Sequence, residues 1–208
     1  MITLEVKDLA KRFGRKFVFK GLNFSENSRI IGISGSNGSG KSTLLKCLSY
    51  LYKPTNGSVV WFDENKKIES TDFKRILGYA APYLNLYAEF SAIENIQFQL
   101  ELKQITFSRK QIEDIGEQLG INFSLDQTFG SLSSGQQQRV KLLSAFSGNS
   151  KLIFLDEPGT NLDESGIEAV LSLAKKAHEL DRTVVLASNS TKELAICDVV
   201  HSLNLTLV

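Results

Sequence analysis

Apolar residues along this chain form short runs typical of buried strands, separated by segments in which apolar residues recur at helical spacing. The strand-like runs lie at 2–6, 17–24, 30–34, 58–62, 152–155, 183–187 and 199–207. A first helix is expected to begin around Gly40 and to end before the turn residues at 54–57. Strands that alternate with helical patterns indicate an α/β fold built on a sheet.

The middle of the chain has a different pattern. From about 88 to 147, apolar residues such as Ile93, Ile96 and Leu100 follow helical spacing, and there is little strand signal. We therefore expect one domain over 1–208, with a core of about 1–87 and 148–208 and a helical subdomain of about 88–147 inserted into it.

Charge and composition exclude several classes of protein. The chain has 208 residues, with 24 Lys and Arg against 23 Asp and Glu, so no charge excess attracts it to nucleic acid. Its longest apolar runs are far shorter than the roughly 20 residues of a membrane-spanning helix. The N-terminal segment alternates like a strand, unlike a signal peptide, which favours a cytosolic location. Cys47 and Cys197 lack metal-ligand spacing, and we expect both to be small buried residues.

A phosphate-binding loop is the clearest motif. Gly35, Ser36, Asn37, Gly38, Ser39, Gly40, Lys41 and Ser42 match the pattern of glycine, four residues, glycine, lysine and serine. The glycines let successive backbone N–H groups point at phosphate oxygens, and the following helix adds about half a positive charge. Lys41 supplies a full charge, Ser42 is expected to bind Mg²⁺, and Thr43 completes the cradle. The expected ligand is a nucleoside triphosphate.

Two acids follow the buried run at 152–155. If the strand before these acids and the strand before the phosphate loop are parallel, Asp156 and Glu157 would emerge beside that loop. Asp156 is expected to hold Mg²⁺ through its hydration shell, and Glu157 to polarise a water in line with the γ-phosphate. Without the phosphate loop, a plain strand-end turn would be the better interpretation.

A third motif, Leu132-Ser133-Ser134-Gly135-Gln136, opens a helical stretch. Ser133 or Ser134 is a natural N-cap, and taken alone the motif is explained by capping. In order and spacing, however, the three motifs together resemble those of ATP-binding cassette (ABC) proteins. The likeness extends over essentially the whole chain.

The resemblance implies a P-loop NTPase core with a mixed sheet, whose N-terminal β part is antiparallel, and an inserted helical subdomain. It implies that Phe13 stacks on adenine and that 161–163 forms the loop after the catalytic acid. It also implies a head-to-tail dimer, in which ATP lies between the phosphate loop of one subunit and the signature residues of the other. Those signature residues are Ser133, Ser134, Gly135 and Gln136.

Two positions depart from the family pattern. Pro82 stands where the family usually has a glutamine that touches Mg²⁺ and the attacking water, and Asn189 stands where it usually has a histidine. Proline offers no side-chain donor, and asparagine cannot become cationic. Either hydrolysis uses a different set of hydrogen bonds, with Asn189 as one catalytic contact beside Lys41 and Glu157, or turnover is slow. Because Glu157 is retained, we expect an ATPase.

The function that these motifs favour is the ATPase subunit of an ABC transporter. Such a subunit would pair with a second cassette and an integral membrane permease, and would lie on the inner face of the cell membrane. The aromatic segment 83–90 is either a docking surface for the permease or core packing. The alternatives are a non-transport ABC ATPase of cofactor assembly, translation or DNA repair, and an ATP-dependent switch with weak hydrolysis.

Overall fold

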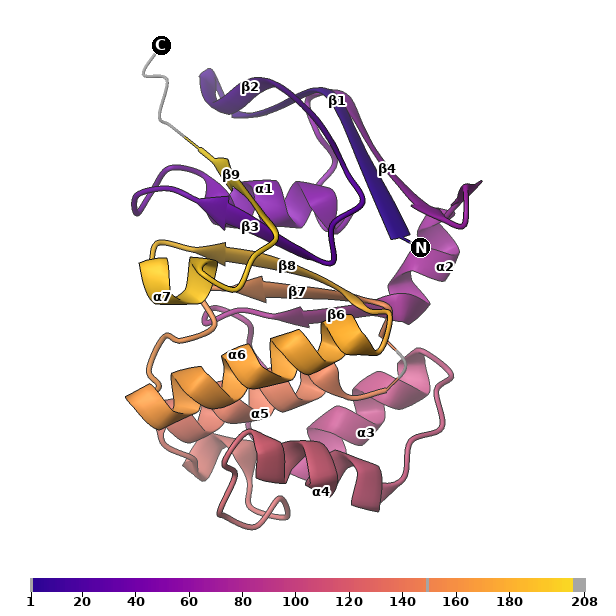
Figure 1. The fold of residues 1–208 in the computed structure, drawn as a ribbon. Helices are drawn as coiled ribbons and strands as arrows, with labels where there is room; N and C mark the ends of the chain where they lie inside the picture. Colours follow the sequence, from indigo (N-terminus) through magenta and orange to yellow (C-terminus); the bar gives the residue numbers. More distant parts are fainter. Residues whose placement is uncertain (1, 149, 204–208) are drawn as a thin grey trace.

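Two sheets of different kinds lie one above the other in the computed structural model, which describes residues 2–148 and 150–203 (Figure 1). An antiparallel sheet forms one outer layer, and a parallel sheet forms the middle layer. Helices cover the other face of the parallel sheet.

The antiparallel sheet has the strand order β2-β1-β4-β5. Its strands are β1 (Ile2–Phe13), β2 (Lys16–Glu26), β4 (Asn56–Asp63) and β5 (Lys66–Lys67). Buried and more exposed residues alternate along the first half of β1, because one face of this sheet packs on the core and the other faces solvent. The strand-like alternation predicted for the N-terminal segment is therefore found.

The parallel sheet has the strand order β6-β7-β8-β3-β9. Its strands are β3 (Ile30–Ser34), β6 (Leu77–Ala80), β7 (Leu152–Asp156), β8 (Thr183–Ser188) and β9 (Val199–Ser202). Every residue of β7 and β8 is buried, which explains their continuous apolar runs. Since all these strands are parallel, the loops at their carboxyl ends gather at one edge.

Seven α-helices and one 3₁₀ helix connect these strands within the described residues. They are α1 (Lys41–Leu48), α2 (Ser70–Ile76), α3 (Ala92–Leu102), α4 (Arg109–Gln118), η1 (Phe129–Ser131), α5 (Ser134–Phe146), α6 (Glu164–Glu179) and α7 (Thr191–Leu194). Helix α1 lies between the two sheets, and α3, α4, α5 and α6 lie on the far side of the parallel sheet (Figure 1).

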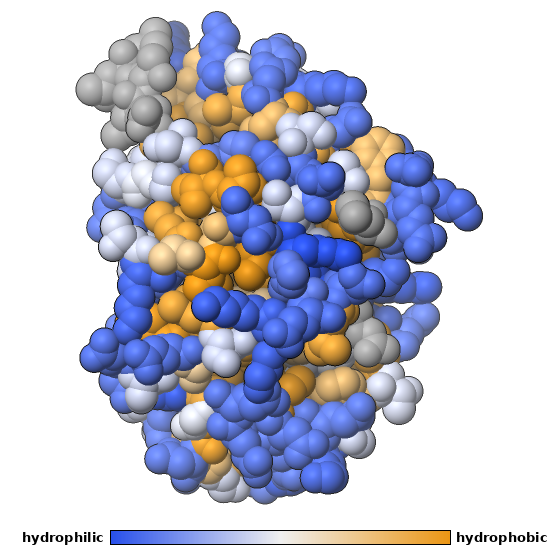
Figure 2. Space-filling view, viewed as in Figure 1, coloured by the Kyte–Doolittle hydropathy of each residue, from blue (hydrophilic) through white to orange (hydrophobic). Residues whose placement is uncertain are grey.

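The parallel sheet has an apolar core on each face. On the α1 side, Leu44 and Leu45 pack with Trp61 and Phe154, and the indole of Trp61 donates to the carbonyl of Leu48 at 2.8 Å. On the other side, residues of α3, α5 and α6 pack with β7 and β8. The face seen in Figure 2 is mostly hydrophilic, and its apolar atoms gather where the layers meet. The sheet is thus fixed from both sides.

The predicted α/β fold of the P-loop NTPase type is confirmed. Several short elements were not predicted, among them β5, which is formed by two lysines, and α2, whose one buried residue is Phe73. The last strand ends at Ser202, and 204–207 of the predicted run lie outside the described residues. The stretch 88–147 contains α3, α4, η1 and α5, and its separation from the core as a subdomain stays a prediction.

Of the two cysteines, Cys47 is buried as expected, whereas Cys197 is only half-buried, so the expectation for Cys197 was wrong. Cys197 follows the short α7, and its sulfur lies against Gly32 of β3 near the edge of the sheet. Across the part of the chain that the structure describes, no helix combines the length and the apolar character that a membrane crossing requires.

A close contact between β6 and α5 gives a test of this packing. A Cβ atom added to Gly78 would lie 2.0 Å from the carbonyl oxygen of Ala145, so the two elements must move apart in Gly78→Ala. We expect this change to lower the free energy of unfolding by about 1–3 kcal/mol.

Gly116 is the matched control, because a Cβ there meets nothing closer than 3.7 Å. Gly116→Ala in helix α4 is expected to leave the free energy of unfolding unchanged or to raise it by up to about 1 kcal/mol. Urea unfolding of both variants measures the difference. Equal effects of the two substitutions would contradict the contact between β6 and α5.

Candidate functional site

Residues of four loops meet at the carboxyl edge of the parallel sheet. Strands β6, β7, β8 and β3 are consecutive neighbours in this sheet. The segments after them hold Tyr83, Glu157, Asn189 and the phosphate loop at 35–42. A carboxyl edge of this kind is where open α/β sheets bind ligands.

The phosphate loop needs its glycines. Gly38 and Gly40 have φ values of +81° and +102°, in the left-handed region that side chains disfavour. A Cβ on Gly40 would also lie 2.4 Å from Cγ1 of Val18. Gly40 caps helix α1 without a side chain, so the first N–H groups of α1 remain available to an anion.

Lys41 is held inside the loop by three oxygen atoms. Its ammonium group, on a side chain only 5% exposed, lies 2.8 Å from the carbonyl oxygen of Gly35 and 3.3 Å from that of Ser36. The third oxygen is Oε1 of Glu157, at 3.0 Å. The three oxygens accept the N–H groups of the Lys41 ammonium that a bound phosphate would otherwise use. They therefore hold this positive charge in the loop before a ligand binds.

Glu157 is positioned by a turn immediately after β7. Its φ is +44°, which a non-glycine residue adopts rarely, and its N–H donates to the carbonyl of Ala187 at 2.8 Å. The bond to β8 fixes this turn and directs the carboxylate at Lys41. The sequence placed Glu157 beside the phosphate loop but did not predict this ion pair.

Asp156 is almost completely buried, with 1% of its surface exposed. Oδ2 accepts a hydrogen bond from the Tyr83 hydroxyl at 2.8 Å, whereas Oδ1 has no hydrogen-bond partner within residues 2–148 and 150–203. Burial raises the pKa of Asp156, although the hydroxyls of Ser42 and Tyr83 act to lower it. A cation would relieve this burial penalty.

The residues around Asp156 suit Mg²⁺. The Ser42 hydroxyl and the unpartnered Oδ1 are hard oxygen donors of the kind that Mg²⁺ prefers. Among the described residues, no group of three or more His, Cys, Asp or Glu side chains could hold a metal. A Mg²⁺ ion bound by Ser42 and Asp156 would take its remaining ligands from phosphate oxygens and water, as is usual for this ion.

Two tyrosines extend the hydrogen-bond network behind Asp156. The hydroxyls of Tyr79 and Tyr83 lie 2.7 Å apart, and the Lys46 ammonium lies 3.9 Å from the centre of the Tyr83 ring. Burial raises the pKa of both tyrosines far above its ordinary value, so both remain neutral hydroxyls. The sequence analysis considered Tyr83 only as part of an aromatic segment and missed this contact. Its signal was its position in the loop that follows β6, next to β7.

Asn189 lies at the same edge as the phosphate loop. Its Nδ2 donates to Oδ1 of Asn37 at 2.8 Å, so the two predicted residues are brought together although they are far apart in sequence. His201, a histidine that could have replaced the one missing at position 189, has other contacts. Its ring stacks on Phe24, and its Nε2 lies 2.9 Å from Glu26. The structure thus gives no reason to put His201 in the place of Asn189.

The signature residues begin helix α5. The Ser133 hydroxyl accepts from the Gln136 N–H at 3.3 Å, and the Gln136 side chain accepts from the Ser133 N–H at 2.9 Å. This is a capping box, as the capping interpretation predicted for Ser133. Ser134 lies within the first turn. In the described part of the chain, no hydrogen bond or ion pair joins 133–136 to the phosphate loop, so the structure does not bring these two motifs together.

Phe13 and the loop after Glu157 complete the predicted set. Phe13 is 52% exposed at the end of β1, and its ring meets Tyr52 edge to face at 5.9 Å. Asp163 caps α6 by accepting from the Gly166 N–H at 3.0 Å, and Arg139 of α5 contacts the same oxygen at 2.8 Å. Stacking of adenine on Phe13 stays a prediction.

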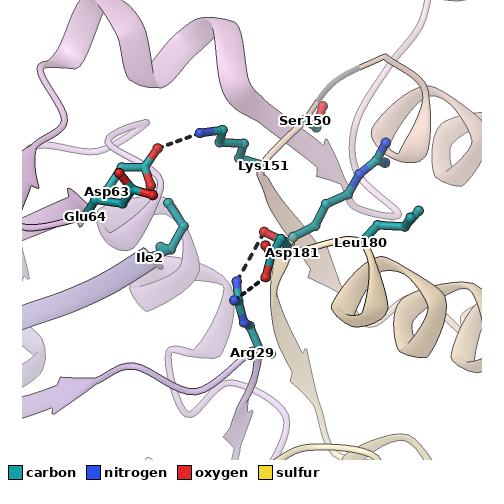
Figure 3. A pocket seen from close by; sticks show the side chains of 9 residues that line it. Ile2, Arg29, Asp63, Glu64, Ser150, Lys151, Leu180 and Asp181 are labelled. Carbon is teal, nitrogen blue, oxygen red and sulfur yellow. Dashed lines mark hydrogen bonds and ion pairs between the residues drawn. The ribbon is translucent and has the colours of Figure 1, made fainter.

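A cavity of about 440 Å³ lies elsewhere, at the amino ends of β3, β7 and β8 (Figure 3). Four of its charged side chains form two ion pairs: Lys151 binds Asp63 at 2.6 Å, and Arg29 binds Asp181. The first pair links the residue before β7 of the parallel sheet to β4 of the antiparallel sheet, and the second links the segments before β3 and β8. The cavity contains none of the predicted site residues, so it is separate from the candidate site.

Comparison with known proteins places this geometry in a family. The family model for the ABC transporter matches residues 19–160. The chain is 32% identical to the cytochrome c biogenesis ATP-binding export protein of Histophilus somni, over 89% of this chain and 86% of that protein. It is 31% identical to the lipoprotein-releasing system ATP-binding protein of Desulfotalea psychrophila, over 94% and 92% of the two chains.

A solved structure supports the same family assignment. A dimeric ATP-binding cassette bound to ADP and Pi, in a post-hydrolysis state, has a TM-score of 0.83 and 25% identity, and the match covers 96% of this chain and 93% of that one. Family model, relatives and fold point the same way, so this chain belongs to the ABC transporter family.

Proposed function

We propose that this chain is the subunit that binds and hydrolyses ATP to power an ABC transporter, and that it works as one half of a head-to-tail dimer. The observation that carries the proposal is the placement of Lys41. Its ammonium lies between two carbonyl oxygens of the phosphate loop and the carboxylate of Glu157. A positive charge for phosphate and a base for water are thereby adjacent.

Binding of ATP would change the partners of Lys41. The phosphate oxygens would replace the carbonyl oxygens of Gly35 and Ser36, together with Oε1 of Glu157, around the ammonium group. This exchange leaves the Glu157 carboxylate free to accept a proton from water. Mg²⁺, held by Ser42 and through water by Asp156, would neutralise charge on the phosphates.

The chemical step then uses Glu157 as a general base. The water oxygen forms a bond to the γ-phosphorus, the bond from that phosphorus to the β–γ bridging oxygen breaks, and Glu157 takes the proton of the water. Lys41 stays on the phosphates and stabilises their charge. Asn189 contributes hydrogen-bond donors at the same edge.

Dimerisation would bring a second helix N-terminus to the γ-phosphate. The first N–H groups of α5 begin at the signature residues, and an N-terminus directed at phosphate adds positive potential. A similar solved cassette is dimeric. In this arrangement the signature residues 133–136 act on the ATP of the partner.

The partner in the membrane would be a permease, which would hold the chain at the cytoplasmic face. Tyr87 and Phe90 are 54% and 39% exposed, and their rings cluster with Phe98 at 5.1–6.3 Å. Exposed aromatic clusters often anchor interfaces, which supports docking over pure core packing for this segment. The helical subdomain of about 88–147 would contain most of this cluster.

A switch with weak hydrolysis is the second candidate. It is favoured by two side chains: Pro82 has no donor, and Asn189 is already bonded to Asn37. Such a protein would dimerise on ATP and release it slowly. The test below on Asn189 separates the two candidates.

Glu157→Gln tests the proposed function most directly. Removal of the base should lower ATP hydrolysis by about 10²- to 10⁴-fold while ATP still binds, because the phosphate loop is unchanged. The tagged variant, loaded with Mg·ATP, is purified from detergent-solubilised native membranes and analysed by mass spectrometry. We expect a stoichiometric multi-pass membrane protein.

Lys41→Ala, which lacks the charge for phosphate, is the control and should recover less of that membrane protein in the presence of ATP. Recovery of soluble partners alone would contradict the transporter assignment. Hydrolysis at the wild-type rate in Glu157→Gln would show that Glu157 is not the base.

Asn189→His tests whether hydrolysis is limited at this position. Histidine can carry a positive charge, so it should stabilise the charge that develops on the γ-phosphate and raise steady-state ATP hydrolysis by about tenfold or more. The control is Asn37→Ala, which removes the partner of Asn189 without adding a charge. An unchanged or lower rate in Asn189→His would contradict slow turnover caused by the missing histidine.

A further inference from the structure

The loop after β6 lacks the polar side chain that the family pattern places there. Pro82 has neither a donor nor an acceptor in its side chain. The next residue, Tyr83, reaches the buried carboxylate of Asp156 with its hydroxyl at 2.8 Å. This loop therefore does place a polar group at the carboxylate of Asp156, and that group is the hydroxyl of a tyrosine.

The two oxygens of Asp156 are in different situations. Oδ2 is held by Tyr83, and Oδ1 is buried without a partner in the described part of the chain. A buried carboxylate oxygen without a donor is costly unless a ligand satisfies it. The contact with Tyr83 thus leaves one defined oxygen for the hydration shell of a cation.

Tyr83 is itself fixed by its surroundings. The Tyr79 hydroxyl lies 2.7 Å from the Tyr83 hydroxyl, and the Lys46 ammonium lies over the ring at 3.9 Å. One residue before it, the carbonyl of Pro82 accepts from the ammonium of Lys141 at 2.6 Å. Lys141 is a buried residue of α5, so this loop connects the helix of the signature residues to the carboxylate of β7.

Tyr83 is not part of the apolar packing of the protein. The residue is 44% exposed, and it belongs to neither apolar core. Its polar contacts are with the Tyr79 and Asp156 side chains. Removal of the hydroxyl therefore takes away these two hydrogen bonds and leaves the ring in place.

We propose that Tyr83 is the positioning residue for the carboxylate of Asp156, the expected magnesium ligand. Its hydroxyl holds Oδ2 and leaves Oδ1 available to the cation that ATP would bring. Lys141 fixes the loop backbone from the side of α5. This inference rests on the proposed function, since it assumes that a metal–nucleotide complex is bound at Asp156.

Tyr83→Phe tests the proposal with a readout other than activity. Mn²⁺, a paramagnetic substitute for Mg²⁺, is titrated in the presence of a non-hydrolysable ATP analogue, and free Mn²⁺ is followed by electron paramagnetic resonance. Loss of a group that orients a metal ligand typically weakens metal binding by about 10–100-fold. We expect at least a tenfold loss of Mn²⁺ affinity in Tyr83→Phe, with unchanged binding of the analogue in EDTA.

Two further variants separate positioning from a general effect. Tyr50→Phe removes a hydroxyl that donates to the carbonyl of Val59 at 3.1 Å, away from Asp156, and should leave Mn²⁺ affinity at the wild-type value. Tyr79→Phe removes the group behind Tyr83 and should give a smaller loss in the same direction as Tyr83→Phe. Thermal unfolding checks that all three variants fold.

Wild-type Mn²⁺ affinity in Tyr83→Phe would overturn the proposal, and so would an equal loss in Tyr50→Phe. A different result would show that the proposed function itself is wrong. In that case the wild-type protein itself would bind no nucleotide analogue, with or without metal.

Discussion

The ion pair between Lys41 and Glu157 is the interaction on which the rest of the site depends. It joins the loop after β3 to the turn after β7 at 3.0 Å, across the end of β8. A buried ammonium group must be paired, and here the pairing also places the phosphate-binding charge beside the base. The parallel sheet, covered on both faces, provides the rigid edge that this geometry needs. Because Glu157 has a positive φ and bonds to Ala187, the direction of its carboxylate is set by the backbone.

Several groups in this chain satisfy each other until a ligand replaces them. Lys41 binds carbonyl oxygens of its own loop, and Ser133 and Gln136 cap one another at the start of α5. Asp156 is an exception, because Oδ1 has no partner in the described residues. Oδ1 of Asp156 is therefore a buried oxygen that a cation would satisfy.

The sequence predicted what is local and missed what depends on strand order. The phosphate loop, its strand and α1 are contiguous, so a pattern of glycines and lysine was sufficient to find them. The two acids at 156 and 157 were found because the apolar run 152–155 ends immediately before them. The bonds of Tyr83 to Asp156 and of Asn189 to Asn37 join residues 73 and 152 positions apart, and only the order β6-β7-β8-β3 brings them together. Elements with almost no apolar pattern, such as β5, gave no signal.

In the proposed head-to-tail dimer, the complete site forms between two copies of the chain. Trans-complementation tests it: Lys41→Ala removes the phosphate charge, and Ser133→Arg obstructs the signature. Each variant alone should hydrolyse ATP only at background level. In a head-to-tail dimer of the two, one interface combines an intact phosphate loop with an intact signature, so the mixture should recover hydrolysis. A mixture that shows no more than the sum of the two separate activities would contradict a shared site.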